Sequence, residues 1–231
     1  MLNKLSQLFD QVATIATLPV APLQFRLVLN PENVAKIYKS YTKAHPKYKI
    51  VQHKAVGAAL VDLSRFRNRD EYMEEIKGRN SAGGHARKAK GKGYTVTEID
   101  RNNFVDDIHE INTSVEIRQG RPMPPHYREK TTSYPSEVNY KYYGVLNAAG
   151  KLVAYCDLGF YGNFVGISRV IGVRNNDGIM HLMMTEIICQ LIEAGNYQYL
   201  MYDTYFGASP GLKTFKKMLG FQPYRAKYSI Q

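Results

Sequence analysis

The stretch that decides the fold is residues 199–228, YLMYDTYFGASPGLKTFKKMLGFQPYRAKY. It begins with the end of an apolar run that closes in Tyr-Asp-Thr-Tyr, which predicts a strand over residues 197–205. A loop of small residues with Gly and Pro follows. Residues 212–221, LKTFKKMLGF, then favour a short basic helix that stops at Gly220. Since the remaining residues favour a strand, this part of the chain is predicted to run strand, loop, helix, strand.

Upstream of this stretch, the spacing of apolar residues predicts a strand, a helix, three consecutive strands and a second helix. Short turns join the three strands, so we expect them to be antiparallel neighbours. The first helix has an apolar face formed by Phe104, Ile108, Ile111 and Val115. The second helix is expected over residues 178–194, with a cap from Asn175, Asn176 and Asp177. The expected strands are residues 94–99, 140–147, 151–160 and 164–173.

Residues 1–93 are expected to form an N-terminal extension, followed by a domain over residues 94–231. In the extension, strands are predicted over residues 24–29 and 56–63, and helices over 2–16, 32–42, 70–76 and 86–90. The last of these helices is basic. It lies in a stretch rich in Gly and Ala, a composition that is also typical of a flexible linker.

The order of elements over residues 94–231 resembles the GNAT acyltransferase fold. The resemblance implies an α/β (α+β) protein whose mixed, mostly antiparallel central sheet is flanked by helices, with an N-terminal α/β extension. The Phe215-Lys216 pair ahead of Gly220-Phe221 is similar to the pair that the Fem family of aminoacyl-tRNA-dependent aminoacyltransferases carries on this helix. The basic helix before residue 94 also resembles the Fem-type lead-in, and residues 1–93 then correspond to a reduced GNAT-like half.

The composition favours a globular protein that binds polyanions. The chain has 231 residues, 44% of them hydrophobic, which is enough for a core of its own. Its formal net charge of +11 predicts attraction to a tRNA, a nucleotide-linked substrate or a CoA-type donor. Basic residues gather without acidic ones over residues 77–92 and 213–231. The alternative is a solvated basic face that binds nothing specific.

The spacing of cysteine and histidine argues against a disulfide framework or a metal site. Cys156 and Cys189 form no CxxC motif, and the six histidines show neither HxH nor HExxH spacing. We expect no metal, no tightly bound cofactor and a cytoplasmic location. No stretch of the sequence approaches the roughly 20 apolar residues of a membrane-spanning helix.

The candidates for the chemistry are Lys216, Asp203 and Phe215. By resemblance to the Fem family, Lys216 stands where acetyltransferases of the GNAT fold commonly keep a Tyr, and its ammonium stabilises the oxyanion and the nearby tRNA end. Asp203 is expected where a strand opens into the site, and its carboxylate could accept a proton from the incoming ammonium. The alternatives are a solvated Lys and an Asp that caps the following loop. The resemblance also implies that strands 165–173 and 197–205 part, which leaves a gap for the donor carbonyl.

The donor is expected near the turn that precedes residue 178. In acyl-CoA-dependent proteins of the GNAT fold, this loop follows the pattern Gln/Arg-x-x-Gly-x-Gly/Ala and turns backbone N–H groups towards a pyrophosphate. Here residues 174–179 read RNNDGI, with Asp177 in the place of the first Gly. This departure, the Phe-Lys pair and the basic runs favour an aminoacyl-tRNA slightly over an acyl-CoA. The predicted donor-binding residues are Arg174, Asn175, Gly178, Lys213, Lys217, Arg87, Lys88 and Lys90.

The acceptor is expected where the helix that starts near residue 102 ends. Two arginines around Gly120 can clamp a carboxylate or a phosphate through paired N–H donors. The alternative for these arginines is a surface ion pair with Glu110 or Glu116. The predicted acceptor-binding residues are Arg118, Gln119, Arg121, Tyr202 and Tyr205.

The sequence therefore predicts an N-acyltransferase that moves an acyl or aminoacyl group from an activated donor to an amine of a small molecule or peptide. One alternative is an acetyl-CoA-dependent N-acetyltransferase of the GNAT fold. The other is an RNA-binding module that keeps the fold without the chemistry.

Overall fold

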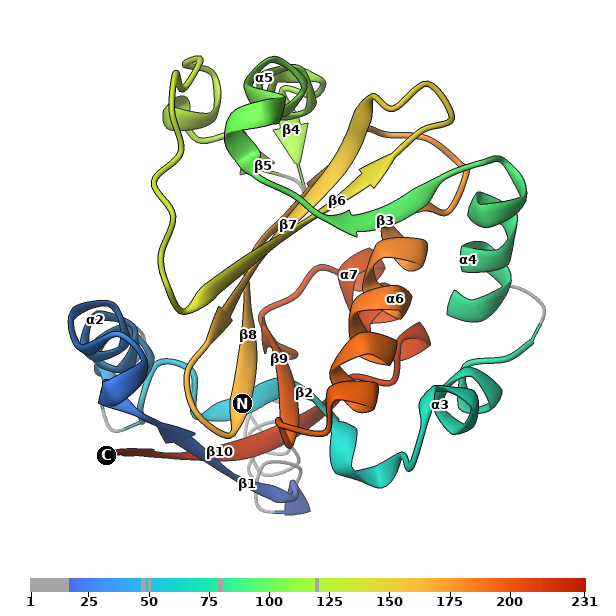
Figure 1. The fold of residues 1–231 in the computed structure, drawn as a ribbon. Coiled ribbons are helices and arrows are strands. Elements are labelled where there is room, and N and C mark those ends of the chain that lie inside the picture. The colour runs from blue at the N-terminus through green and yellow to red at the C-terminus, as the bar shows by residue number, and fades with distance from the viewer. Residues whose placement is uncertain (1–16, 47–48, 50, 79–80, 119–120) are drawn as a thin grey trace, which may run out of the picture.

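An eight-stranded sheet runs through the computed structural model, which describes residues 17–46, 49, 51–78, 81–118 and 121–231 (Figure 1). The helix predicted over residues 2–16 lies outside the described residues. The strand order is β1-β10-β2-β9-β8-β7-β6-β3. The strands are β1 (Val20–Phe25), β2 (Val56–Asp62), β3 (Thr95–Glu98), β6 (Tyr140–Leu146), β7 (Leu152–Phe160), β8 (Phe164–Gly172), β9 (Tyr199–Thr204) and β10 (Gln222–Ile230). The pairs β1/β10 and β8/β9 are parallel and the other neighbours are antiparallel, so the sheet is mixed.

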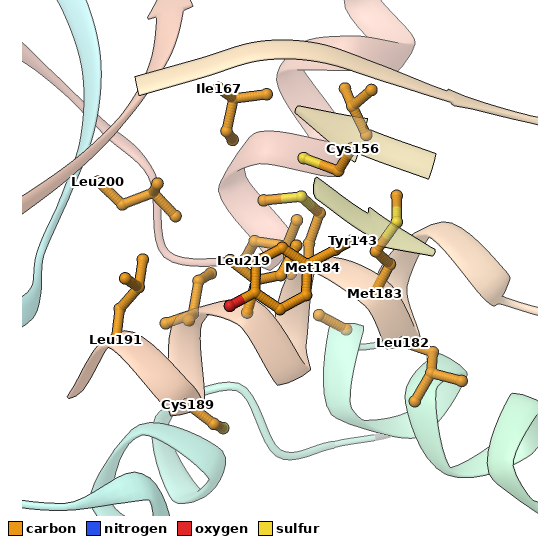
Figure 2. Packing of buried hydrophobic residues seen from close by; sticks show 14 of the residues in the cluster. Tyr143, Cys156, Ile167, Leu182, Met183, Met184, Cys189, Leu191, Leu200 and Leu219 are labelled. Atoms are coloured by element: carbon orange, nitrogen blue, oxygen red, sulfur yellow. The ribbon is translucent and has the colours of Figure 1, made fainter. Parts of the chain in front are cut away.

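Helices cover both faces of the sheet, and alternate residues of each strand point to opposite faces. On one face lie α3 (Arg69–Glu75), α4 (Ala82–Gly91), α6 (Ile179–Ala194) and α7 (Pro210–Met218), whose side chains pack in one cluster with Val165 and Leu200. Figure 2 shows part of this cluster, with Met183, Met184 and Leu191 of α6 and Leu200 of β9. On the other face lie α2 (Pro31–Thr42), which packs with Phe164, and α5 (Val105–Thr113), which packs with Tyr155. A short β4/β5 pair (Ile117–Arg118 and Arg121–Pro122) follows α5.

Residues 94–231 follow the predicted order of elements, except that the short β4/β5 pair was not predicted. The strand predicted over residues 24–29 was wrong in its second half, because β1 ends at Phe25 and Leu27–Leu29 form a 3-10 helix. In the register of the pair, Phe25 at the end of β1 lies opposite Ile230 at the end of β10. Two strands of the N-terminal part belong to the same sheet, since β1 pairs with β10 and β2 lies between β10 and β9.

The predicted side-chain cap of α6 is also corrected. The cap position is Gly178, in the left-handed conformation (φ 89°), and no side chain caps it. The Asp177 carboxylate instead pairs with Lys92 and accepts a hydrogen bond from the Tyr94 hydroxyl at 2.8 Å. α7 does have a side-chain cap: it starts at Pro210, after Ser209, whose hydroxyl accepts from the Leu212 N–H. This cap fixes the start of the helix that carries Lys216.

Candidate active site

The two central parallel strands part after three residue pairs. β8 pairs with β9 from Phe164/Tyr199 to Gly166/Met201, and each strand then continues without the other. Both also carry irregularities in register with their outer neighbours, β8 against β7 and β9 against β2. A bulge bends the strand that contains it. The gap that the GNAT resemblance implies is therefore present, between the second half of β8 and the end of β9.

Two cavities meet at this gap, and both are lined by Arg118 and Asp203. The first has a volume of about 380 Å³ and is walled by β8 and by the loop after α5, including Met123 and Tyr127. These two side chains belong to the cluster that α5 forms, so this cavity lies on the α5 face of the sheet. The second, of about 320 Å³, is walled by α7 and the loop before it. The gap therefore lies between a cavity on the α5 face of the sheet and a cavity beside α7.

Lys216 lies in the wall of the second cavity and is fully buried. Its Nζ donates to the backbone carbonyls of Tyr202 at 2.6 Å and Thr204 at 2.9 Å. The ammonium also lies 4.6 Å from the centroid of the Tyr202 ring, a distance suited to a cation–π contact. Burial lowers the pKa of Lys216 to about 8; Asp203 raises this pKa and Lys54 lowers it further. Lys216 therefore changes charge in a pH range where enzymes work, which an ordinary Lys does not.

Asp203 lies between the two carbonyls that Lys216 holds. Its backbone has φ 51°, and it is the one non-glycine residue with a positive φ in the described ranges. Such a conformation costs energy for most residues but is more acceptable for Asp. The carboxylate forms an ion pair with the Lys54 ammonium at 3.1 Å, and 60% of the Asp203 side chain is exposed. The Asp203 carboxylate thus lies in the walls of both cavities.

Arg118 is the predicted acceptor residue that the structure brings to the gap. Its Nη2 donates to the Val170 carbonyl at 2.7 Å, which fixes the guanidinium against the part of β8 that leaves β9. Of the other residues predicted here, Gln119 lies outside the described residues and Arg121 begins β5. Among the described side chains, Arg118 forms no ion pair with Glu110 or Glu116, and Glu110 instead pairs with Lys151 at 2.6 Å.

The three predicted aromatic residues, Tyr202, Phe215 and Tyr205, lie in different surroundings. Tyr202 lines the first cavity, and burial raises the pKa of its hydroxyl well above its usual value. Phe215 packs against the His181 ring at 4.8 Å between centroids, so it supports α7 from the α6 side. Tyr205 donates its backbone N–H to the Gly57 carbonyl at 2.6 Å and is not among the described residues that line either cavity.

The predicted donor-binding residues do not line the two cavities in the part of the chain that the structure describes. Arg174 donates to the Ile117 carbonyl at 2.8 Å, and Lys88 donates to the Asn176 carbonyl at 2.6 Å. Lys90 pairs with Glu186 on α6 at 2.6 Å. The remaining residues of this set lie on three segments: Arg87 on α4, Asn175 and Gly178 in the turn before α6, and Lys213 and Lys217 on α7.

A buried charge cluster beside the first cavity was missed by the sequence reasoning. Asp157 on β7 lies opposite Arg169 on β8, with Arg169 Nε 3.8 Å from its Oδ2. Arg101 donates from Nη1 to the same Oδ2 at 3.2 Å and stacks on the Tyr142 ring at 3.7 Å. Burial raises the pKa of the Asp157 carboxyl, while Arg169 and Arg101 act to lower it. The available signal was that Asp157 and Arg169 are each the one charged residue of an apolar strand.

Within the described ranges, no three His, Cys, Asp or Glu side chains come together in a way that could hold a metal ion. Among the helices described there, none has both the length and the apolar character needed to cross a membrane.

Comparison with known proteins supports the fold assignment. No protein-family model and no curated protein match the sequence. Among solved structures, FemX is similar with a TM-score of 0.56 and 11% identity, over 84% of this chain and 66% of that chain. A C-terminal domain from Agrobacterium fabrum, assigned to lysylphosphatidylglycerol synthetase, is similar with a TM-score of 0.51 and 16% identity, over 74% of this chain and 58% of that one. The chain thus spans less than two thirds of either neighbour, and at these identities the likeness concerns the fold: the protein has the mixed, mostly antiparallel GNAT fold.

Proposed function

We propose that the protein is an N-acyltransferase that forms an amide between an activated acyl group and an amine. The observation that carries the proposal is Lys216, whose buried ammonium stands beside the gap between β8 and β9 and in the wall of one of the two cavities that meet there. A positive charge that is fixed in a low-dielectric site stabilises a developing oxyanion far better than the same charge in water.

The reaction joins the amine nitrogen to the acyl carbon of an ester or thioester and breaks the bond from that carbon to the donor oxygen or sulfur. The ammonium of the acceptor first loses one proton. After attack, the nitrogen loses a second proton, and the leaving oxygen or sulfur takes up one. The net products are an amide, the free alcohol or thiol, and one proton.

Lys216 and Asp203 divide these tasks in our proposal. The Lys216 ammonium has three N–H donors, and two are used by the carbonyls of Tyr202 and Thr204. The third is assigned to the acyl oxygen in the second cavity. Asp203, which is exposed at the gap and paired with Lys54, accepts the proton of the acceptor ammonium.

The surroundings of the α6 N-terminus support an aminoacyl-tRNA over an acyl-CoA as the donor. A helix N-terminus attracts an anion such as a pyrophosphate. Here the protein supplies its own anion, since the Asp177 carboxylate lies there with Lys92 and Tyr94 as partners. The Gly178 Cα also lies against α4, because an added Cβ would come within 2.4 Å of the His85 carbonyl oxygen. Both donor classes are made in the cytoplasm, where we propose that the protein acts.

Transfer assays with labelled donors test the proposal. Purified protein is incubated with a pool of amine acceptors and either tRNA charged with labelled amino acids or labelled acetyl-CoA. We expect a labelled amide from charged tRNA. Lys216→Met should lower the rate by about 10²–10³-fold, as loss of an oxyanion donor does. Lys227→Met, at an exposed position of β10, should keep the wild-type rate.

The possible outcomes of these assays distinguish the candidate functions. Product from acetyl-CoA alone overturns the donor preference and favours the N-acetyltransferase alternative. Salt-sensitive tRNA binding without product from any donor favours the RNA-binding module. An unchanged rate in Lys216→Met refutes the role given to the ammonium.

A further inference from the structure

The first cavity carries more positive charge than its own residues neutralise. Lys54, Arg118 and Arg169 all line it, and Asp203 is the one acidic residue in its described wall. The Lys54 ammonium is already matched by the Asp203 carboxylate at 3.1 Å. The guanidinium groups of Arg118 and Arg169 therefore have no acidic partner in the described wall of the cavity itself.

Arg169 is held in place by the buried charge cluster behind it. Its partner Asp157 is 7% exposed and is shared with Arg101, which is nearer, at 3.2 Å against 3.8 Å. Two arginines thus face one carboxylate, and the cluster keeps a net positive charge. The Arg169 side chain is 31% exposed, and its guanidinium lies 5.3 Å from the centroid of the Tyr127 ring, which lines the same cavity.

Arg118 stands in the same wall. In the described part of the chain it has a backbone partner, the Val170 carbonyl, and no acidic one. Because Val170 directly follows Arg169, the two guanidinium groups are anchored at neighbouring positions of β8. A guanidinium whose backbone contact uses one N–H keeps other donors for a ligand.

We infer that the acceptor bears an anionic group, a phosphate or a carboxylate, which binds Arg169 and Arg118 in the first cavity while its amine faces Asp203. This inference rests on the proposed function and names the acceptor class: a small molecule with an amine at one end and anionic oxygens at the other. A volume of about 380 Å³ lies in the range of small-molecule pockets. Asp157, Arg101 and Tyr127 act as positioning residues for Arg169.

Binding measured without any donor tests the inference independently of catalysis. Titration calorimetry compares phosphoethanolamine, β-alanine and ethanolamine, which share an amine and differ in the second group. We expect phosphoethanolamine or β-alanine to bind at least about tenfold more tightly than ethanolamine, as a charge-assisted hydrogen bond provides. The stronger of the two identifies the anionic group. If neither anion improves on ethanolamine, the inference is wrong.

Variants test whether the anionic group binds at Arg169 and Arg118. Arg169→Gln and Arg118→Gln should each lower the affinity for the preferred anionic amine about tenfold to a hundredfold and leave the affinity for ethanolamine unchanged. Arg67→Gln, whose side chain is 87% exposed and pairs with Glu71, is the matched control and should bind as wild type. Thermal unfolding of each variant checks the fold; if Arg169→Gln does not fold, Arg118→Gln decides the question.

The remaining outcomes separate this inference from the proposed function. If Arg169→Gln weakens tRNA binding but not anion binding, the arginines contact the donor and the inference fails. Equal acyl transfer to ethanolamine and to the anionic amines also refutes it, although the acyltransferase proposal survives. Tight anion binding without transfer from any donor refutes the acyltransferase proposal and leaves the anion site.

Discussion

Lys216 and Tyr202 are joined twice: the Lys216 Nζ donates to the Tyr202 carbonyl at 2.6 Å, and its ammonium lies 4.6 Å from the centroid of the Tyr202 ring. These contacts tie α7 to the end of β9. The further bond to Thr204 means that one buried ammonium holds the carbonyls on both sides of Asp203. The residue proposed to stabilise charge therefore also maintains the unusual backbone of the residue proposed to accept the proton.

The first prediction concerns stability and pH. The pKa of Lys216 is about 8 in the folded protein, against 10.5 for an ordinary Lys. Between these values the unfolded chain binds more protons than the folded one, so the contribution of Lys216 to the free energy of unfolding rises with pH. We expect urea denaturation to show that the free energy of unfolding of wild type increases relative to that of Lys216→Met as the pH is raised from 7.5 to 10.5. A flat or falling difference would contradict the lowered pKa.

The second prediction concerns rate and pH. Acyl transfer to an amine ordinarily becomes faster as pH rises, because more of the acceptor is deprotonated. If the Lys216 ammonium stabilises the oxyanion, the rate at saturating donor should instead fall above about pH 8, where this group loses its proton. Lys216→Arg keeps its charge through this range, so any activity it retains should lack the falling limb. A falling limb in Lys216→Arg as well would assign it to another group.

Local sequence patterns were sufficient to predict the order of elements over residues 94–231, since helical and strand spacing, turns and the Phe-Lys helix are encoded by neighbouring residues. The first cavity was not predictable in this way. Lys54 and Asp203 are far apart in the sequence and meet because β2 pairs with β9. Asp157 and Arg169 become neighbours through the β7/β8 register.

The predicted site residues also differ in how far local sequence could reveal their surroundings. Lys216, Asp203, Tyr202 and Arg118 meet because strand ends and the helix after β9 converge at the gap. Arg174, Asn175 and Gly178, in the loop before α6, were predicted to bind the donor. The contacts of this loop with α4 depend on the packing of a distant segment, which no local pattern reveals.

The third prediction tests the buried charge cluster. Arg101→Met should remove the hydrogen bond to Asp157, the bond to the Pro135 carbonyl at 2.6 Å and the stacking on Tyr142. Breaking a buried ion pair from one side costs about 3–5 kcal/mol. Urea denaturation at neutral pH should show a loss of that order. Arg67→Met, at an exposed ion pair, should stay within about 0.5 kcal/mol of wild type. A loss of similar size in both variants would mean that Arg101 is not a buried partner.

The fourth prediction tests whether α4 covers the loop before α6, on which the donor preference depends. Gly178 has φ 89° and lies where an added Cβ would come within 2.4 Å of the His85 carbonyl oxygen. Gly150 has φ 76° but no atom within 4 Å of such a Cβ. Gly150→Ala therefore carries the backbone cost alone, about 1–2 kcal/mol, and Gly178→Ala adds about 1–3 kcal/mol for the forced contact.

Urea denaturation of these two variants gives the comparison directly, and the backbone cost largely cancels in the difference between them. A larger loss in Gly178→Ala supports close packing of α4 on this loop and thus the argument that the helix N-terminus is not open to a pyrophosphate. Equal losses would mean that α4 stands away from the loop. Near the α6 N-terminus, the donor preference would then rest on Asp177 alone, beside the Phe215-Lys216 pair and the basic runs of the sequence.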